Sequence, residues 1–367
     1  YSEGFVQQAL GMYDRALESY DRAIELNSTD PDFWRARGVA LYSLGRYEEA
    51  VSSYDEALVI DPAQGDIWYQ KGLALSSMER YDEAIECYDF AITIDGSDAA
   101  SWHAKGCALY GLGRSEEALD CYDRAIAIDP SSTDVWYNKG IVLASLGRGE
   151  EADRCYDAAV EIDPQYYPAW YNKGLSLFGL GMYNESIACY DRAIAIDPSL
   201  VAVWNNKGNA LFSLGRFDEA LVCYRRAVEI DPSYSNAWYN QGIVLQRLGL
   251  GEEAVEAYDR LIEIDPGYRD VWYNRGLALF GLGRFEEAIV SFDRVFETDP
   301  ANGDAWYNQG LALSRLGRYE EALGCYDKAL ESDPRRKDVL NNKCNTLYGL
   351  ARYNESVSCY DQVIGVD

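Results

Sequence analysis

The sequence repeats itself with a period of 34 residues, and this period limits the possible folds more than any other feature of the chain. Tryptophan recurs nine times at that step, and leucine takes the tenth place. These positions are Trp34, Trp68, Trp102, Trp136, Trp170, Trp204, Trp238, Trp272, Trp306 and Leu340. A unit this short cannot bury its own apolar face, so we expect consecutive repeats to stack and share one core.

Each repeat carries the pattern of two helices. We number positions so that tryptophan is position 4 of every repeat. In repeat 133–166, Trp136, Gly140 and Leu143 share one helical face, and Gly147 then favours a left-handed cap. The second helix begins at acidic residues and ends at an Asp-Pro pair, because proline cannot continue the helical hydrogen-bond ladder. Glycine at position 8 and alanine at positions 20 and 27 are small, so we expect the two helices to approach closely there.

The residues shared by the repeats are Trp at position 4, Gly at 8, Leu at 11, Gly at 15, Tyr at 17 and 24, Ala at 20 and 27, and Pro at 32. This pattern resembles the tetratricopeptide repeat (TPR) family over the whole chain. The resemblance implies an all-α, right-handed superhelical solenoid of about eleven helix-turn-helix units. In that family, the first helix of each repeat lines a concave groove that binds a peptide or protein, and the second forms the outer surface.

We predict one solenoid over residues 1–367, with nine full and two partial repeats. Its parts are a partial repeat at 1–30, full repeats at 31–64, 65–98, 99–132, 133–166, 167–200, 201–234, 235–268, 269–302 and 303–336, and a partial repeat at 337–367.

Composition excludes several classes of function. The 33 Lys and Arg residues against 61 Asp and Glu residues give a net charge of −28, which repels nucleic acids and anionic lipids. The single histidine, His103, leaves little acid–base or metal chemistry, and no phosphate loop, nucleophile–base pair or cofactor fingerprint is present. We therefore predict no enzyme activity, no cofactor and no metal. We expect no membrane span and no signal peptide, and we predict a cytoplasmic protein.

A row of asparagines at position 6 is the strongest candidate for a binding site. Its members are Asn138, Asn172, Asn206, Asn240, Asn274, Asn308 and Asn342. Amides can donate to and accept from the backbone of an extended peptide without reading its side chains. Stacked helices lie about 10 Å apart and an extended chain rises about 3.3 Å per residue, so one asparagine meets roughly every third ligand residue. The row is similar to the asparagine ladder of O-linked N-acetylglucosamine transferase. The alternative is that asparagine here is only a common, solvated choice.

Aromatic residues run beside this row and add to the predicted groove. At position 5 they are Tyr137, Tyr171, Tyr239, Tyr273 and Tyr307, and at position 12 they include Phe178, Phe212 and Phe280. These rings can contact ligand side chains, or they can pack between helices and only hold the stack. Asn205 and Asn209 join Asn206 on one helical turn, either as a polar contact site or as drift on a solvated face.

Two other periodic patterns favour structural roles. Position 7 is basic and position 25 is acidic in most repeats, which predicts a ladder of ion pairs between neighbouring helices. Gln241 and Gln309 interrupt it. Cysteine recurs at position 23, but neighbours about 10 Å apart exceed disulfide reach, so we predict that all nine cysteines are free thiols.

Three functional hypotheses follow. The first is a scaffold that binds an extended, neutral or basic peptide or protein segment in the groove. The second is end-to-end self-association into a homo-oligomer, through Val357, Tyr360 and Val363 at one end. Phe5, Val6 and Leu10 are the candidate residues at the other end. The third is a targeting segment of a larger protein, for example a transferase.

Overall fold

The chain folds entirely into helices over the residues that its computed structural model describes, which are 1–268 and 270–365. There are 22 α-helices in this part of the chain. The predicted all-α helical-repeat solenoid is confirmed. The chain divides into two compact units, Tyr1–Met182 and Tyr183–Asp367, which we describe separately.

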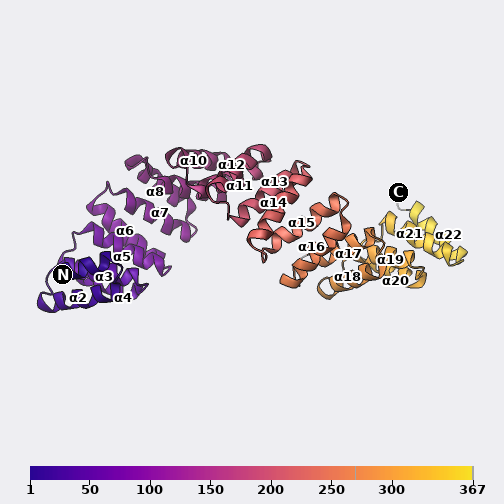
Figure 1. Cartoon of the computed structure of the whole chain (residues 1–367), viewed down its shortest axis with the longest axis horizontal. Coiled ribbons are helices and arrows are strands. Elements are labelled where there is room, and N and C mark those ends of the chain that lie inside the picture. The colour runs from indigo at the N-terminus through magenta and orange to yellow at the C-terminus, as the bar shows by residue number, and fades with distance from the viewer. Residues whose placement is uncertain (269, 366–367) are drawn as a thin grey trace. The chain divides into compact units, whose positions relative to one another are not determined.

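The first compact unit contains helices α1 to α11. Their bounds are α1 Ser2–Ala9, α2 Tyr13–Leu26, α3 Pro31–Ser43, α4 Tyr47–Ile60, α5 Gly65–Ser77, α6 Tyr81–Ile94, α7 Ala99–Gly111, α8 Ser115–Ile128, α9 Thr133–Ser145, α10 Gly149–Ile162 and α11 Tyr167–Gly179. Each helix packs against the next one along the chain, as Figure 1 shows for α2 to α8.

The second compact unit contains helices α12 to α22 and has the same consecutive packing. Their bounds are α12 Tyr183–Ile196, α13 Val201–Ser213, α14 Phe217–Ile230, α15 Ser235–Arg247, α16 Gly251–Ile264, α17 Val271–Gly281, α18 Phe285–Thr298, α19 Gly303–Arg315, α20 Tyr319–Ser332, α21 Lys337–Gly349 and α22 Tyr353–Ile364. The final residues of the predicted repeat 337–367, residues 366–367, lie outside the described residues.

The two helices of a repeat meet where glycine at position 8 faces tyrosine at position 24. A Cβ atom added to Gly140 would lie 2.5 Å from Cε1 of Tyr156, closer than any real contact. Tyr156 is 1% exposed, and its neighbours Ala152 and Ala159 are fully buried. The small residues therefore admit a buried aromatic ring between the helices, as the sequence predicts.

Two sets of polar contacts join one repeat to the next. Every tryptophan at position 4 donates its indole N–H to the backbone carbonyl six residues earlier, as Trp136 does to Pro130 at 3.0 Å. The predicted ion-pair ladder is also confirmed. It joins position 7 to position 25 of the preceding repeat, as in Lys71 with Asp55 at 2.6 Å and Arg275 with Asp259 at 2.6 Å.

The interruption of the ladder at Gln241 has a physical cause. The residue that precedes it by sixteen positions is Arg225, where other repeats have aspartate. A lysine in place of Gln241 would face that arginine, whereas the neutral amide does not repel it. Arg225 pairs instead with Glu253 at 2.7 Å. At the second interruption, Gln309 keeps the bridge by donating to Asp293 at 2.6 Å.

The prediction that all nine cysteines are free is wrong for two of them. Cys344 and Cys359 form a disulfide between α21 and α22, with a Cα–Cα distance of 5.5 Å. The spacing argument considered neighbouring repeats and overlooked position 8 of the same repeat. Cys344 replaces the glycine there, and the close approach of the two helices brings it to Cys359. The other seven cysteines are free.

The last repeat also corrects part of the predicted exposed end. Tyr360 and Val363 are half-buried and pack against the cluster that contains the disulfide, because no tyrosine fits beside Cys344 as it does beside glycine. Val357 is 61% exposed, as are Phe5 at 63% and Val6 at 57% near the other end. Leu10 is exposed too.

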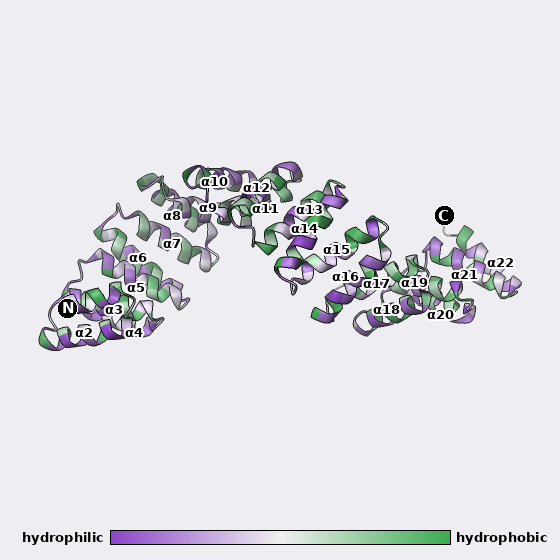
Figure 2. Ribbon diagram, in the orientation of Figure 1, coloured by the Kyte–Doolittle hydropathy of each residue, from purple (hydrophilic) through white to green (hydrophobic). Residues whose placement is uncertain are grey.

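Hydrophobic and hydrophilic residues share each helix in both units (Figure 2). Among the described helices, none has both the length and the apolar character that crossing a membrane requires.

We expect Gly310→Ala to lower the free energy of unfolding by about 1–3 kcal/mol, since overpacking a core costs this much. Its Cβ atom would lie 2.6 Å from Cε1 of Tyr326. The matched control is Gly324→Ala in the same repeat, where no atom lies within 4 Å and alanine is expected to stabilise the helix by about 1 kcal/mol. Urea denaturation followed by circular dichroism measures both. Equal stability of the two variants would contradict the proposed packing.

We expect reduction of the Cys344–Cys359 disulfide to accelerate amide hydrogen exchange in α21 and α22. Closing a loop of this size stabilises a fold by about 3 kcal/mol. The control is a Cys344→Gly variant, which has the glycine of the other repeats and is expected to respond little to reductant. Unchanged exchange in the reduced wild-type protein would rule out this stabilising role.

Candidate functional site

The predicted asparagine row lies on the first helices of consecutive repeats. We call this surface the asparagine face and define it by the side chains at positions 5 and 6. In the second compact unit it comprises α13, α15, α17, α19 and α21, and in the first compact unit α9 and α11 carry the same positions as a separate surface. All seven position-6 asparagines are half-buried, so each keeps part of its surface in contact with solvent.

Four of these asparagines make the same pair of hydrogen bonds. The Nδ2 group donates to the tyrosine hydroxyl at position 5 of the preceding repeat and to the backbone carbonyl four residues earlier, at 2.9–3.1 Å. The acceptors are Tyr137 and Pro168 for Asn172, Tyr239 and Asp270 for Asn274, Tyr273 and Asp304 for Asn308, and Tyr307 and Asp338 for Asn342. The position-5 tyrosines therefore join the row directly.

This pattern determines which atoms of the amide face outward. A backbone carbonyl can only accept, so the amide nitrogen must be the atom that faces it. Both of its hydrogens are then used within the chain. We predicted from the sequence that the amides donate to and accept from a ligand, but in these four repeats only Oδ1 remains for a ligand.

The tyrosine hydroxyls supply the missing donor. Tyr137, Tyr273 and Tyr307 each accept from an asparagine, and each keeps its own hydroxyl hydrogen for another partner. Burial raises the pKa of Tyr137, Tyr273 and Tyr307, so all three stay protonated at neutral pH. One asparagine oxygen and one tyrosine O–H per repeat match the N–H and C=O groups of a peptide backbone.

At the first member of the row, histidine replaces tyrosine. Asn138 lies 2.8 Å from Nε2 of His103 and also donates to the sulfur of Cys107 at 3.7 Å. Burial lowers the pKa of His103, which keeps the imidazole neutral and able to accept. Burial also raises the pKa of the Cys107 thiol, the opposite of what an activated nucleophile requires.

In the middle of the row, a cluster of amides replaces the tyrosine contact. Asn240 donates to Oδ1 of both Asn205 and Asn209, at 3.0 and 3.1 Å. Asn209 in turn donates to Asn206 at 3.3 Å and accepts from the Tyr224 hydroxyl at 2.8 Å. Asn205 is only 4% exposed, so it acts as a buried hydrogen-bond partner of Asn240.

The position-12 rings lie apart from these hydrogen bonds. Phe212 and Phe280 pack against the position-17 rings of their own repeats, Phe217 and Phe285, with centroids 5.3 Å apart. Phe178 is half-buried on α11, as is Tyr171. The sequence could not have distinguished these arrangements, because positions 5 and 12 carry similar rings.

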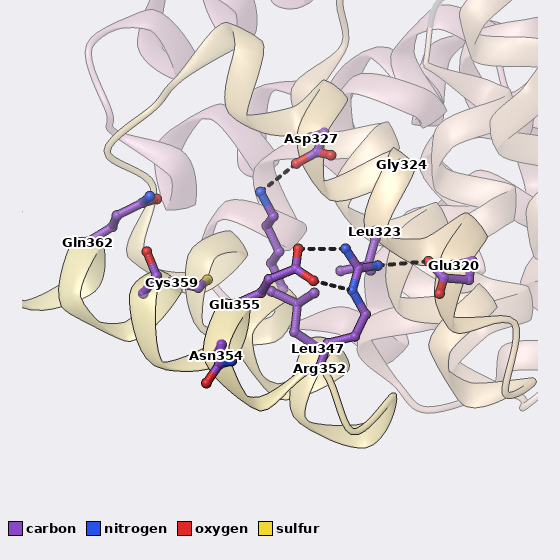
Figure 3. A pocket seen from close by; sticks show the side chains of 12 residues that line it. Glu320, Leu323, Gly324, Asp327, Leu347, Arg352, Asn354, Glu355, Cys359 and Gln362 are labelled. Atoms are coloured by element: carbon purple, nitrogen blue, oxygen red, sulfur yellow. Dashed lines mark hydrogen bonds and ion pairs between the residues drawn. The ribbon is translucent and has the colours of Figure 1, made fainter.

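A second type of site opens between the second helices of neighbouring repeats. One example, of about 650 Å³, lies among α20, α21 and α22 (Figure 3). Arg352 bridges Glu355 and Glu320 at 2.6 and 3.1 Å, and Lys343 pairs with Asp327 at 2.6 Å. The charges that line this cavity therefore largely neutralise one another.

One carboxylate beneath the asparagine face is poorly accommodated. Asp153 lies in α10 at position 21 of its repeat, where the other repeats have valine, isoleucine or leucine. Its Oδ1 atom is buried without a hydrogen-bond partner. Burial raises the pKa of Asp153, against the opposing effects of Ser176 and Lys173 on the adjacent helix α11. The helix α11 also carries Asn172, so Asp153 packs against the helix that holds this member of the asparagine row.

Comparison with known proteins identifies the family. A profile described as tetratricopeptide repeat matches residues 2–65, 103–167 and 273–336, more than half of the chain. Related profiles match 65–98 and 167–200, 189–222, and 208–249 with 252–283. The chain belongs to the tetratricopeptide repeat family. This membership supports a protein–protein interaction scaffold, and proteins of this fold are typically non-enzymatic.

Several solved structures of TPR proteins are similar to this chain. The C-terminal part of a TPR repeat-containing protein from Cytophaga hutchinsonii is 13% identical, with a TM-score of 0.57, and the match covers 65% of this chain and 97% of that one. YrrB, described as a TPR protein with an unusual peptide-binding site, is 22% identical with a TM-score of 0.45, over 51% and 96% of the two chains. MamA is 24% identical with a TM-score of 0.42, over 44% and 94%. No curated protein matches the chain significantly.

We expect Asp153→Val to stabilise the protein at pH 7 by about 1 kcal/mol, the usual cost of a buried polar group without a partner. The folded-state pKa of Asp153 is raised, so its destabilising effect is present above that pKa. The effect disappears as the pH falls toward the ordinary aspartate value. The gain measured by thermal denaturation is therefore expected to shrink between pH 7 and pH 4. Asp153→Asn is the isosteric control, and a gain that does not depend on pH would contradict this explanation.

Proposed function

We propose that the chain is a non-enzymatic scaffold that holds an extended polypeptide segment along the asparagine face. The observation that carries this proposal is the repeated hydrogen-bond pattern of Asn172, Asn274, Asn308 and Asn342. In successive repeats of the second compact unit, Asn308 with Tyr273 and Asn342 with Tyr307 each keep an acceptor and a donor available. An extended chain offers N–H and C=O groups at regular intervals in return.

Hydrogen bonds of this kind recognise the backbone of the bound peptide and depend little on its side chains. The scaffold would therefore bind segments of many sequences. The electrostatic potential of the protein would select among these segments by their charge. The net charge of −28 favours neutral or basic segments and repels acidic ones. We expect basic segments to bind more weakly as the salt concentration rises.

Three further predictions rest on the sequence: a cytoplasmic location, a targeting role in a larger protein and end-to-end self-association. Oligomeric state is best followed in the same binding experiment by light scattering.

We expect the triple variant Asn274→Ala, Asn308→Ala, Asn342→Ala to bind extended peptides about 100-fold more weakly than the wild type. Each lost hydrogen bond contributes about 1 kcal/mol, and about 3 kcal/mol corresponds to that ratio. A library of extended peptides titrated by fluorescence anisotropy measures the affinities.

The matched control is Asn354→Ala, which removes an exposed amide from α22 in the same compact unit. It is expected to bind like the wild type. Circular dichroism checks that helix content is retained in every variant. Wild-type affinity in the triple variant, or no binding by the wild type at all, would overturn the proposal.

A further inference from the structure

In two repeats, the residue at position 26 of the second helix lies beside the tryptophan at position 4. Phe90 stacks on Trp68 with ring centroids 4.6 Å apart, and the guanidinium of Arg294 lies 5.9 Å from the centre of the Trp272 ring. Most other repeats also have a long basic residue at this position. These residues are Arg124, Arg192, Arg226, Arg260 and Lys328.

Repeat 133–166 departs from this rule, because Ala158 occupies position 26. The methyl group of Ala158 cannot cover the indole ring of Trp136, whose cationic neighbour is Lys139 of the first helix, with Nζ 5.9 Å from the ring centre. A cavity of about 490 Å³ opens here among α8, α9 and α10, and both Trp136 and Ala158 line it. We call it the Trp136 cavity. Its deeper wall is apolar and includes Leu119, Leu143 and Cys155.

The rim of the Trp136 cavity is charged, with an excess of carboxylates. Lys139 pairs with Asp123. Arg148 pairs with Glu151 at 2.7 Å and with Glu116 at 3.5 Å. Two charged groups remain on the rim, Arg154 and Asp120.

The hydrogen bond from Arg148 lowers the pKa of the Glu151 carboxyl group, and the nearby charge of Arg154 adds to this effect. Asp120 makes no ion pair with any residue in the described part of the chain. The rim therefore has one carboxylate available to a cationic guest.

We infer that the Trp136 cavity binds an arginine side chain of a partner protein. The chain itself shows which group suits this place, since Arg294 occupies the corresponding position beside Trp272. A planar guanidinium stacks on the indole face and can still donate to a carboxylate at its edge, here Asp120. Lysine has no planar group to stack, and phenylalanine would leave Asp120 without a partner.

This surface is distinct from the asparagine face. The cavity is formed mainly by the second helices α8 and α10, whereas the asparagines lie on first helices. The inference therefore does not depend on peptide binding by the asparagine row.

The test uses the peptides acetyl-Ala-Arg-Ala-amide, acetyl-Ala-Lys-Ala-amide and acetyl-Ala-Phe-Ala-amide with the whole chain. Binding is followed by NMR from the indole N–H signal of Trp136, labelled with nitrogen-15 and assigned with a Trp136→Leu variant. Leucine is accepted at this position in the last repeat, as Leu340. We expect the arginine peptide to shift the signal with a dissociation constant of roughly millimolar size, because a single cation–π contact is weak.

The decisive variant is Ala158→Arg, which gives this repeat the arginine found in its neighbours. We expect it to fold normally and to bind the arginine peptide at least about tenfold more weakly, since its own guanidinium fills the cavity. The control is Gln362→Arg, the same change in the last repeat, which is expected to leave binding unchanged. Tighter binding of the phenylalanine peptide, or undiminished binding by Ala158→Arg, would overturn the inference.

Discussion

The contact between glycine at position 8 and tyrosine at position 24 is the interaction on which the other features depend. It brings the two helices of each repeat together over a buried ring, as Gly140 does with Tyr156. That close packing places tryptophan where its indole N–H reaches the preceding loop, and it holds position 7 opposite the acid of the previous repeat. Where Cys344 replaces the glycine, the ring is displaced and a disulfide joins the helices instead.

The stacking of repeats also creates the binding properties of the asparagine face. In four repeats, one of the two hydrogen bonds of the asparagine crosses to the tyrosine of the preceding repeat. The stack consumes the donors of the amide and leaves its acceptor. It also leaves the tyrosine hydroxyl hydrogen, which together with the acceptor complements a peptide backbone.

The fold could be predicted well from the sequence because the same residue pattern recurs in every repeat, and each recurrence supports the same interpretation. The helix pairs, the small residues at their contact and the ion-pair ladder all follow from the spacing. The site was harder to predict, since Asn172 was identified but not the direction of its hydrogen bonds. The disulfide was missed because the sequence argument compared Cys359 only with its counterparts in other repeats. The Trp136 cavity combines residues of α8, α9 and α10, and this combination appears only in three dimensions.

The pairing of Arg225 with a neutral Gln241 has a consequence for how such a chain can evolve. The two residues belong to adjacent repeats, and each suits the other. A recombination event that placed repeat 201–234 before a repeat with a basic residue at position 7 would set Arg225 opposite a lysine or an arginine. Although the repeats look alike, they are not interchangeable, because the contacts between adjacent repeats depend on the order in which the repeats occur.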